Sequence, residues 1–227
     1  MANVSYKGSG ISIHTATKTL DPLAEGAEQT CVLDFGRASD ISAFTEAATS
    51  SPTATANAGG ATVTITAGGS KAKMLYPNLS GTSSTNRMTC SVRIKSADPA
   101  EAGHGIFVGF VENTTITNVM TTAGALRAAA ATKDMVGWYK DVAGNLDWYA
   151  SSDSTEGVNE VDSGLDMADD TYVNLGVELV GNEVNFFIDG ELVKSYTGMH
   201  DQSATLIPAI VCSEDEVVTI SAFAAGM

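Results

Sequence analysis

The stretch YVNLGVELVGNEVNFFIDGELV, residues 172–193, decides the fold class. Two runs of alternating apolar and polar residues flank Gly181-Asn182, and a third run begins after Asp189-Gly190. Alternation with a period of two is typical of strands with one buried face. Asp-Gly favours a type I′ turn because both central residues accept a positive φ. The stretch therefore predicts three antiparallel strands joined by two tight turns.

The pattern continues toward the N-terminus. In residues 86–95, NRMTCSVRIK, the apolar side chains alternate with Arg, Thr, Ser and Lys, so one face of a strand is buried and the other meets water. Residues 104–112, HGIFVGFVE, are apolar on both faces and predict a central strand buried on two sides. Gly105 and Gly109 within it indicate a close approach of another backbone or side chain.

Further strands are predicted on both sides of these runs. Residues 134–140 and 146–150 read as a hairpin, and residues 205–212 and 216–223 as the last two strands. Pro208 places the first of these last two strands at an edge or a bulge, because proline cannot donate to a ladder.

The first 80 residues are less regular. Residues 29–35 and 61–67 predict strands, whereas residues 45–60, rich in Ala, Thr, Ser and Gly, predict an extended loop. Residues 123–132 fit either a short helix on propensity or a strand by context, and both remain open.

About a dozen short strands predict an all-β, antiparallel two-sheet sandwich, most simply a jelly roll. We expect an extended N-terminal arm over residues 1–28 and a single β-sandwich domain over residues 29–227. The predicted core residues are Val92, Ile94, Ile106, Val108, Phe110, Val177, Leu179, Phe186 and Ile188.

Composition excludes several classes of protein. The 227 residues are 44% apolar, which argues against a disordered chain, and no apolar run is long enough for a membrane span. The net charge of −15 has the wrong sign for binding a phosphate backbone, so nucleic acid is not an expected partner. Lys194 is the one base in the last 87 residues, which hold 17 Asp and Glu. The first residues show no secretion signal.

Three cysteines, Cys31, Cys90 and Cys212, lie far apart and have no zinc-site spacing. We predict that they are small buried apolar residues, with a Cys31–Cys90 disulfide as the alternative.

The hairpins of residues 172–193 resemble those of the concanavalin A-like (laminin-G-like) jelly-roll superfamily. GIFVGF at residues 105–110, VGWY at residues 136–139 and NLDW at residues 145–148 also resemble its core strands. The resemblance covers residues 70–227. It implies the sandwich fold and leaves function open, because the superfamily includes lectins, glycosidases, adhesive modules and virion surface proteins.

The glycosidase branch of that superfamily carries Glu-x-Asp-x-Glu on one strand, which supplies two carboxylates to the scissile bond. Here Glu160-Val-Asp162-Ser-Gly164 has glycine at the last position, and its surroundings read as turns. Glu214-Asp-Glu216 is contiguous rather than alternating. We therefore expect no enzyme and no catalytic residues.

Two further candidate sites remain. Asp166, Asp169 and Asp170 are close enough in sequence to share a calcium ion, but a solvated acidic loop is the preferred interpretation. No metal and no cofactor are therefore expected.

Trp138-Tyr139 and Trp148-Tyr149 form two pairs on neighbouring predicted strands. Because strand side chains alternate, one ring of each pair faces the core and the other faces outward. The outward rings are a candidate platform for stacking a sugar.

The N-terminal arm holds too few apolar side chains to form a core of its own. Ile11 and Ile13 alternate with polar residues, so the arm could add as a strand to an exposed sheet edge of its own sandwich or, as we favour, of a sister subunit or a shell protein. With Val4 and Tyr6, they are the predicted interface residues.

These features favour a non-enzymatic virion structural protein, most simply a bacteriophage capsid decoration (cement) protein or another particle-surface protein. It would be made in the host cytoplasm, not secreted, and would lie on the virion surface. Its partners would be the major capsid protein or another virion protein and sister subunits, with a trimer suggested by the resemblance. The alternative is a lectin-like carbohydrate-binding module of a host-recognition apparatus, with a glycan as ligand.

Overall fold

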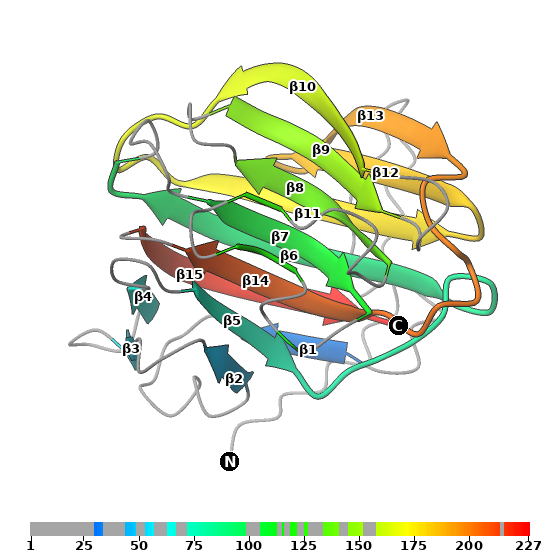
Figure 1. Cartoon of the computed structure of the whole chain (residues 1–227), viewed down its shortest axis with the longest axis horizontal. Helices are drawn as coiled ribbons and strands as arrows, with labels where there is room; N and C mark the ends of the chain where they lie inside the picture. The colour runs from blue at the N-terminus through cyan, green and yellow to red at the C-terminus, as the bar shows by residue number, and fades with distance from the viewer. Residues whose placement is uncertain are drawn as a thin grey trace.

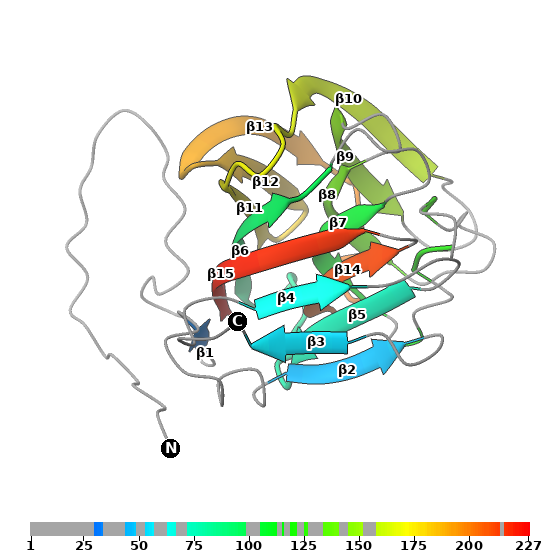
Figure 2. The same ribbon diagram turned by 90° about the vertical axis from the view of Figure 1, so that its left-hand side faces the viewer.

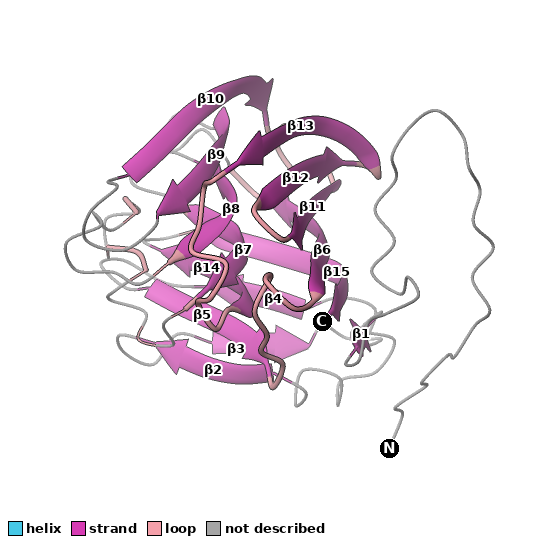
Figure 3. Cartoon of the chain, turned by 90° about the vertical axis from the view of Figure 1, so that its right-hand side faces the viewer, coloured by secondary structure: helices cyan, strands magenta, loops and turns pink. Residues whose placement is uncertain are grey.

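The computed structural model of the chain describes residues 30–33, 44–48, 53–56, 63–66, 72–98, 105–112, 115, 119–121, 125–126, 134–140, 145–151, 158–213 and 216–227. These residues form fifteen strands joined by turns and loops, and none of them is helical (Figure 3). The strands are β1 (Thr30–Leu33), β2 (Phe44–Ala48), β3 (Thr53–Ala56), β4 (Val63–Thr66), β5 (Ala72–Pro77), β6 (Arg87–Ser96), β7 (Ile106–Val111), β8 (Met135–Lys140), β9 (Asn145–Ser151), β10 (Val158–Asp166), β11 (Val173–Val180), β12 (Glu183–Ile188), β13 (Glu191–Thr197), β14 (Ile207–Ser213) and β15 (Val217–Gly226). In these described ranges no helix is long and apolar enough to cross a membrane.

The strands form two antiparallel sheets that pack face to face (Figures 1 and 2). The eight-stranded sheet has the order β13-β12-β11-β6-β15-β4-β3, and β1 pairs with the C-terminal half of β15. The seven-stranded sheet has the order β10-β9-β8-β7-β14-β5-β2. The all-β antiparallel sandwich predicted from the sequence is confirmed.

The core lies between the two sheets and contains the predicted residues. Of these, all are buried except Ile188, which is partly buried against the cluster. Trp138 of β8 links the sheets, because its indole Nε1 donates to the carbonyl oxygen of Gly176 in β11 at 2.9 Å. Its ring also packs edge-on against Phe186, with the centroids 5.4 Å apart. The indole N–H of this tryptophan is thus satisfied inside the core.

A second apolar cluster covers the outer face of the seven-stranded sheet. Side chains of β5, β7, β8 and β14 that point away from the core, such as Phe107 and Tyr139, pack with Val119, Met120 and Leu126. Met120 and Leu126 form an isolated antiparallel bridge. All six residues of β7 are buried, which confirms that this strand is buried on two sides.

Two glycines explain how closely β7 and β8 approach. Gly109 and Gly137 are directly opposite partners. A Cβ on Gly109 would lie 2.3 Å from the carbonyl oxygen of Val136, and one on Gly137 would lie 2.8 Å from the Phe107 ring. The close approach predicted for Gly109 is therefore present, and no larger residue fits either position without moving the backbone.

The turns follow their sequences. Asp189 and Gly190 have φ values of 50° and 84°, as a type I′ turn requires. Pro208 lies in β14, a central strand, which corrects the edge prediction. Proline is tolerated because β14 pairs with β5 only from Ile210 onward, so one side of the strand is unpaired at Pro208.

The predicted loop over residues 45–60 is wrong in part, because β2 and β3 lie within it. β2 pairs with β5 and β3 pairs with β4. Their Ala and Thr side chains give little contrast between faces, so the period of two is hidden in the sequence. The predicted arm, residues 1–28, lies outside the described residues, and its boundary stays a prediction.

The cysteines are free thiols. Cys31 and Cys90 each lie opposite Ala225, on the two sides of β15. Two strand spacings, about 10 Å, separate their Cα atoms, which is too far for a disulfide. Burial raises the pKa of Cys90 and Cys212, so both behave as the predicted small apolar residues.

Candidate functional site

A row of polar residues crosses the outer face of the seven-stranded sheet beside the second apolar cluster. The register places Asp162 of β10 opposite Asp147 of β9, and Asp147 opposite Tyr139 of β8. Tyr139 is in turn opposite Phe107. Directly opposite residues share a face, so these four side chains point away from the inter-sheet core. We call Tyr139, Asp147 and Asp162 the carboxylate row.

The two carboxylates of the row differ in exposure. Asp147 is 7% exposed, whereas Asp162 is exposed. Asp162 Oδ1 accepts a hydrogen bond from the amide N–H of Gly164 at 2.7 Å, and the register of β10 shifts between Asp162 and Asp166. Gly164 has a φ of 69°. The turn-like surroundings expected at Glu160–Gly164 are thus a bulge within a strand, and the bulge holds the Asp162 carboxylate.

Two carboxylates at opposite positions form a pair that the sequence pattern does not reveal. Cβ atoms of such partners lie about 4.5–5.5 Å apart, and like charges there destabilise the sheet. A ligand that donates hydrogen bonds to the exposed Asp162 would remove part of that repulsion. Sequence reasoning missed the pair because its members lie on different strands, 15 residues apart, and it searched along single strands.

The aromatic pairs are only partly as expected. In the first pair one ring faces the core and the other faces outward, as predicted, and the structure shows that Trp138 is the inward ring and Tyr139 the outward one. Tyr139 is nevertheless only 4% exposed, so it is no open stacking platform; the segment containing Met120 covers that part of the face. The side chains of Trp148 and Tyr149 lie outside the described residues.

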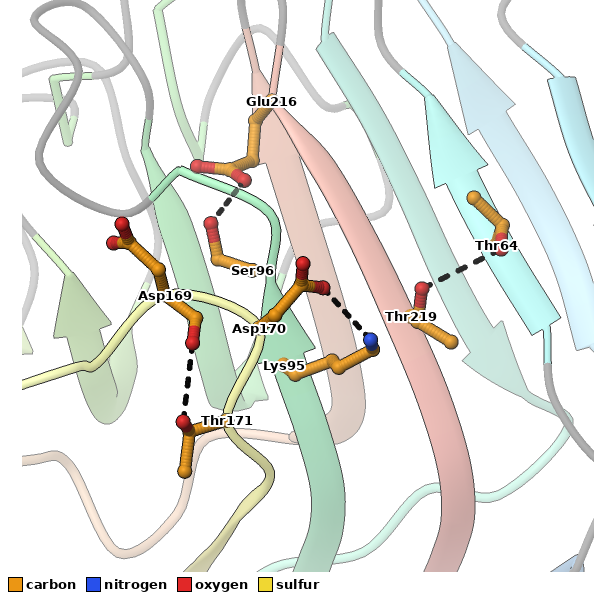
Figure 4. Close-up of polar contacts among 8 residues, drawn as sticks. All are labelled: Thr64, Lys95, Ser96, Asp169, Asp170, Thr171, Glu216 and Thr219. Atoms are coloured by element: carbon orange, nitrogen blue, oxygen red, sulfur yellow. Dashed lines mark hydrogen bonds and ion pairs between the residues drawn. The ribbon is translucent and has the colours of Figure 1, made fainter.

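The acidic residues that follow β10 do not converge on a common point (Figure 4). Asp170 Oδ1 accepts a hydrogen bond from Lys95 Nζ at 2.7 Å, whereas Asp169 uses its backbone oxygen to accept from Thr171 Oγ1 at 3.0 Å. Asp166 belongs to β10 itself. Within the described ranges, no three His, Cys, Asp or Glu side chains are arranged to hold a metal ion.

A buried ion pair joins the two sheets at one end of the sandwich. Lys140 of β8 places Nζ 3.1 Å from Glu216 Oε2, and Ser96 Oγ of β6 donates to Glu216 Oε1 at 2.6 Å (Figure 4 shows the Ser96 contact). Lys140, Glu216 and Ser96 are at most 1% exposed. This arrangement satisfies both charges away from water and serves the structure rather than a ligand.

A serine and a histidine meet at the opposite end. Ser83 Oγ lies 2.7 Å from His200 Nε2, although 117 residues separate them. His200 Nδ1 is buried and has no hydrogen-bond partner among the residues that the structure describes. Asp134 Oδ2 instead accepts from the amide N–H of Asp201 at 2.7 Å. Among the described residues no carboxylate accepts a hydrogen bond from the imidazole, so this contact is not a nucleophile triad.

The predicted interface residues Val4, Tyr6, Ile11 and Ile13 lie outside the described residues. The interface therefore stays a prediction, and the carboxylate row is the candidate site that the described structure supports.

No protein-family model matches the chain, and no curated protein matches its sequence. Solved structures do share its fold. A native glycosidic hydrolase has a TM-score of 0.58 at 14% identity, covering 90% of this chain and 98% of the other. A β-glucanase of Bacillus licheniformis has a TM-score of 0.57 at 11% identity, covering 90% of this chain and 100% of the other. The carbohydrate recognition domain of Emp47p has a TM-score of 0.57 at 11% identity, covering 81% of this chain and 88% of the other.

These likenesses show that the chain has the concanavalin A-like jelly-roll fold, as the resemblance implied. They correct the expectation that the chain is not an enzyme, because hydrolytic enzymes share nearly its whole length. The motif argument behind that expectation considered single strands only, whereas the register places Asp147 and Asp162 opposite each other on two strands. A virion role finds no support among these structures.

Proposed function

We propose that the chain is a lectin-like carbohydrate-binding module whose glycan lies on the outer face of the seven-stranded sheet at β9 and β10, beside the part that the second apolar cluster covers. The carboxylate row carries this proposal. Carboxylates accept hydrogen bonds from sugar hydroxyls, and Asp162 is the exposed carboxylate of the row. The carbohydrate recognition domain with the same fold supports the ligand class.

Charge narrows the class of glycan. β9 and β10 carry the acidic residues Asp147, Glu160, Asp162 and Asp166 and no Lys or Arg. Their negative field repels uronate or sulfated chains and favours neutral or amino sugars. The proposed ligand is therefore a glycan without acidic groups.

Calorimetry on the full chain tests this proposal. Neutral, amino and acidic oligosaccharides are titrated in turn, and we expect binding of a neutral or amino glycan. Asp162→Ala should weaken that binding at least tenfold, since it removes the exposed acceptor of the row. Asp169→Ala is the matched control, because Asp169 is also exposed but uses its backbone oxygen in the contacts of Figure 4.

Two outcomes would change the proposal. Equal binding by Asp162→Ala and the wild-type chain would place the glycan elsewhere. Shortened oligosaccharides after incubation, absent with Asp147→Asn, would extend the function from binding to cleavage by the paired carboxylates.

The virion-surface location, the capsid-protein partner and the trimer stay predictions. The residues assigned to that interface lie outside the described structure, and light scattering on the purified chain measures the trimer directly.

A further inference from the structure

The outer face of the eight-stranded sheet holds an arginine in a fixed orientation. Arg93 of β6 is exposed, between the core residues Val92 and Ile94. Its Cζ lies 4.1 Å from the centroid of the Tyr172 ring. Its Nη1 donates to Ser221 Oγ of β15 at 2.8 Å. Contacts from residues on both sides of β6 therefore orient the guanidinium before any ligand binds.

This guanidinium keeps unused donors. A guanidinium has five N–H groups, and among the described residues Arg93 has no carboxylate partner, although the chain holds 27 Asp and Glu. Ser221 engages Nη1, and among the described residues the edge formed by Nε and Nη2 has no hydrogen-bond acceptor. That edge matches the two oxygens of a carboxylate.

The neighbouring lysine is already neutralised. Lys95 lies two residues along the same face, with Nζ 5.5 Å from the Tyr172 centroid and 2.7 Å from Asp170 Oδ1 (Figure 4). Asp170 has a φ of 50°, and its amide N–H donates to the Ser96 carbonyl at 2.9 Å, which holds its carboxylate near Lys95. The unpaired positive charge of this patch therefore belongs to Arg93.

We propose that Arg93, Tyr172 and Ser221 form a carboxylate-binding site, separate from the carboxylate row on the other sheet. The ligand carboxylate accepts hydrogen bonds from Nε and Nη2 of Arg93. Stacking on Tyr172 reduces the side-chain entropy lost on binding. An acidic sugar and an amino-acid carboxylate present the same group, so the experiment distinguishes these sources.

The full chain is titrated with sodium glucuronate, N-acetylglycine and glucose, and the backbone and arginine Nε resonances are followed by NMR. We expect both carboxylates to shift the resonances of Arg93 and Tyr172, and glucose to leave them unchanged. The tighter of the two carboxylates identifies the source. Equal shifts with glucose, or no shift with either carboxylate, would overturn the site.

Variants distinguish recognition by the planar guanidinium, whose paired N–H donors form a fork, from attraction to a positive charge alone. Arg93→Lys keeps the charge but lacks the fork, and should weaken carboxylate binding at least tenfold. Tyr172→Leu should weaken it severalfold, whereas Tyr172→Phe keeps the stacking ring and should retain it. Lys194→Ala removes an exposed positive charge elsewhere on the sheet and is the control. Unchanged binding by a folded Arg93→Lys chain would overturn the proposal.

Discussion

The two outer faces of the sandwich differ although their strands share one core. On β5, β7, β8 and β14 of the seven-stranded sheet the outward side chains are largely apolar, and Val119, Met120 and Leu126 pack over them. On the eight-stranded sheet they form a polar network. Its hydrogen bonds connect Arg87 to Glu178, Asn185 to Glu178, and Ser195 to Asn185, across four adjacent strands.

This difference explains which strands show alternation in the sequence. β6 alternates because its outer side chains are polar, whereas β7 is apolar throughout because another segment covers its outer face. The side chains that face the core are mainly apolar in both sheets. The side chains on the outer face are apolar where another segment packs on them and polar where that face is open.

The largest expected effect tests whether the covered outer face is a second core. Phe107→Ala on that face and Phe186→Ala between the sheets should each lower the free energy of unfolding by about 3–5 kcal/mol, because both side chains are at most 1% exposed. Leu192→Ala at the exposed edge strand β13 should change it by about 0.5 kcal/mol or less. Urea denaturation measures all three. A loss of unfolding free energy below about 1 kcal/mol for Phe107→Ala would show that the covered outer face is not a second core.

The next effect compares an ion pair inside the sandwich with one on its outer face. Lys140→Met removes the buried ion pair with Glu216 and keeps the Ser96 hydrogen bond, and should cost about 3 kcal/mol. Arg87→Met should cost about 1–2 kcal/mol, since the Arg87 side chain is 31% exposed and water partly replaces it at Glu178. Denaturation curves measure both, and equal costs would mean that burial does not separate the two pairs.

Much of this fold follows from local signals in the sequence. The β6 alternation and the Asp189-Gly190 turn predict strand faces and a hairpin directly, because period and turn chemistry are properties of neighbouring residues. β2 and β3 escaped prediction because Ala and Thr fit either environment. They are strands here because β5 and β4 provide pairing partners.

The candidate sites depend on distant pairs. Asp147 meets Asp162 only through the register of β9 and β10, and Arg93 meets Tyr172 from 79 positions away in the chain. A single sequence supplies the residue types but not this register. Site prediction along one strand therefore missed the pairs that the fold creates between strands.

The smallest expected effect concerns a segment that touches both sheets, residues 198–206. The amide of Gly198 donates to the Asn182 carbonyl in the β11–β12 turn, and the amide of Asp201 donates to Asp134, which precedes β8. His200 lies between these anchors and contacts Ser83. Its protonation state therefore affects how firmly the two sheets are joined at this end.

Burial lowers the pKa of His200 from its ordinary value of 6.5, and the negative charge of Asp201 only partly opposes this effect. Between that value and the lower pKa of the folded state, the unfolded chain binds more protons than the folded chain. The free energy of unfolding therefore falls as the pH drops below 7, and it is constant above pH 7. The slope is at most about 1.4 kcal/mol per pH unit. Hydrogen bonds from Ser203 lower the pKa of Asp201 below its ordinary value of 3.8, so its contribution is lost only in more acidic solution.

The melting temperature between pH 7.5 and pH 5 should therefore fall more in the wild-type chain than in His200→Asn. Parallel curves would show that the imidazole binds protons equally in the folded and the unfolded chain, and that the segment joins the sheets through the amide hydrogen bonds of Gly198 and Asp201 alone.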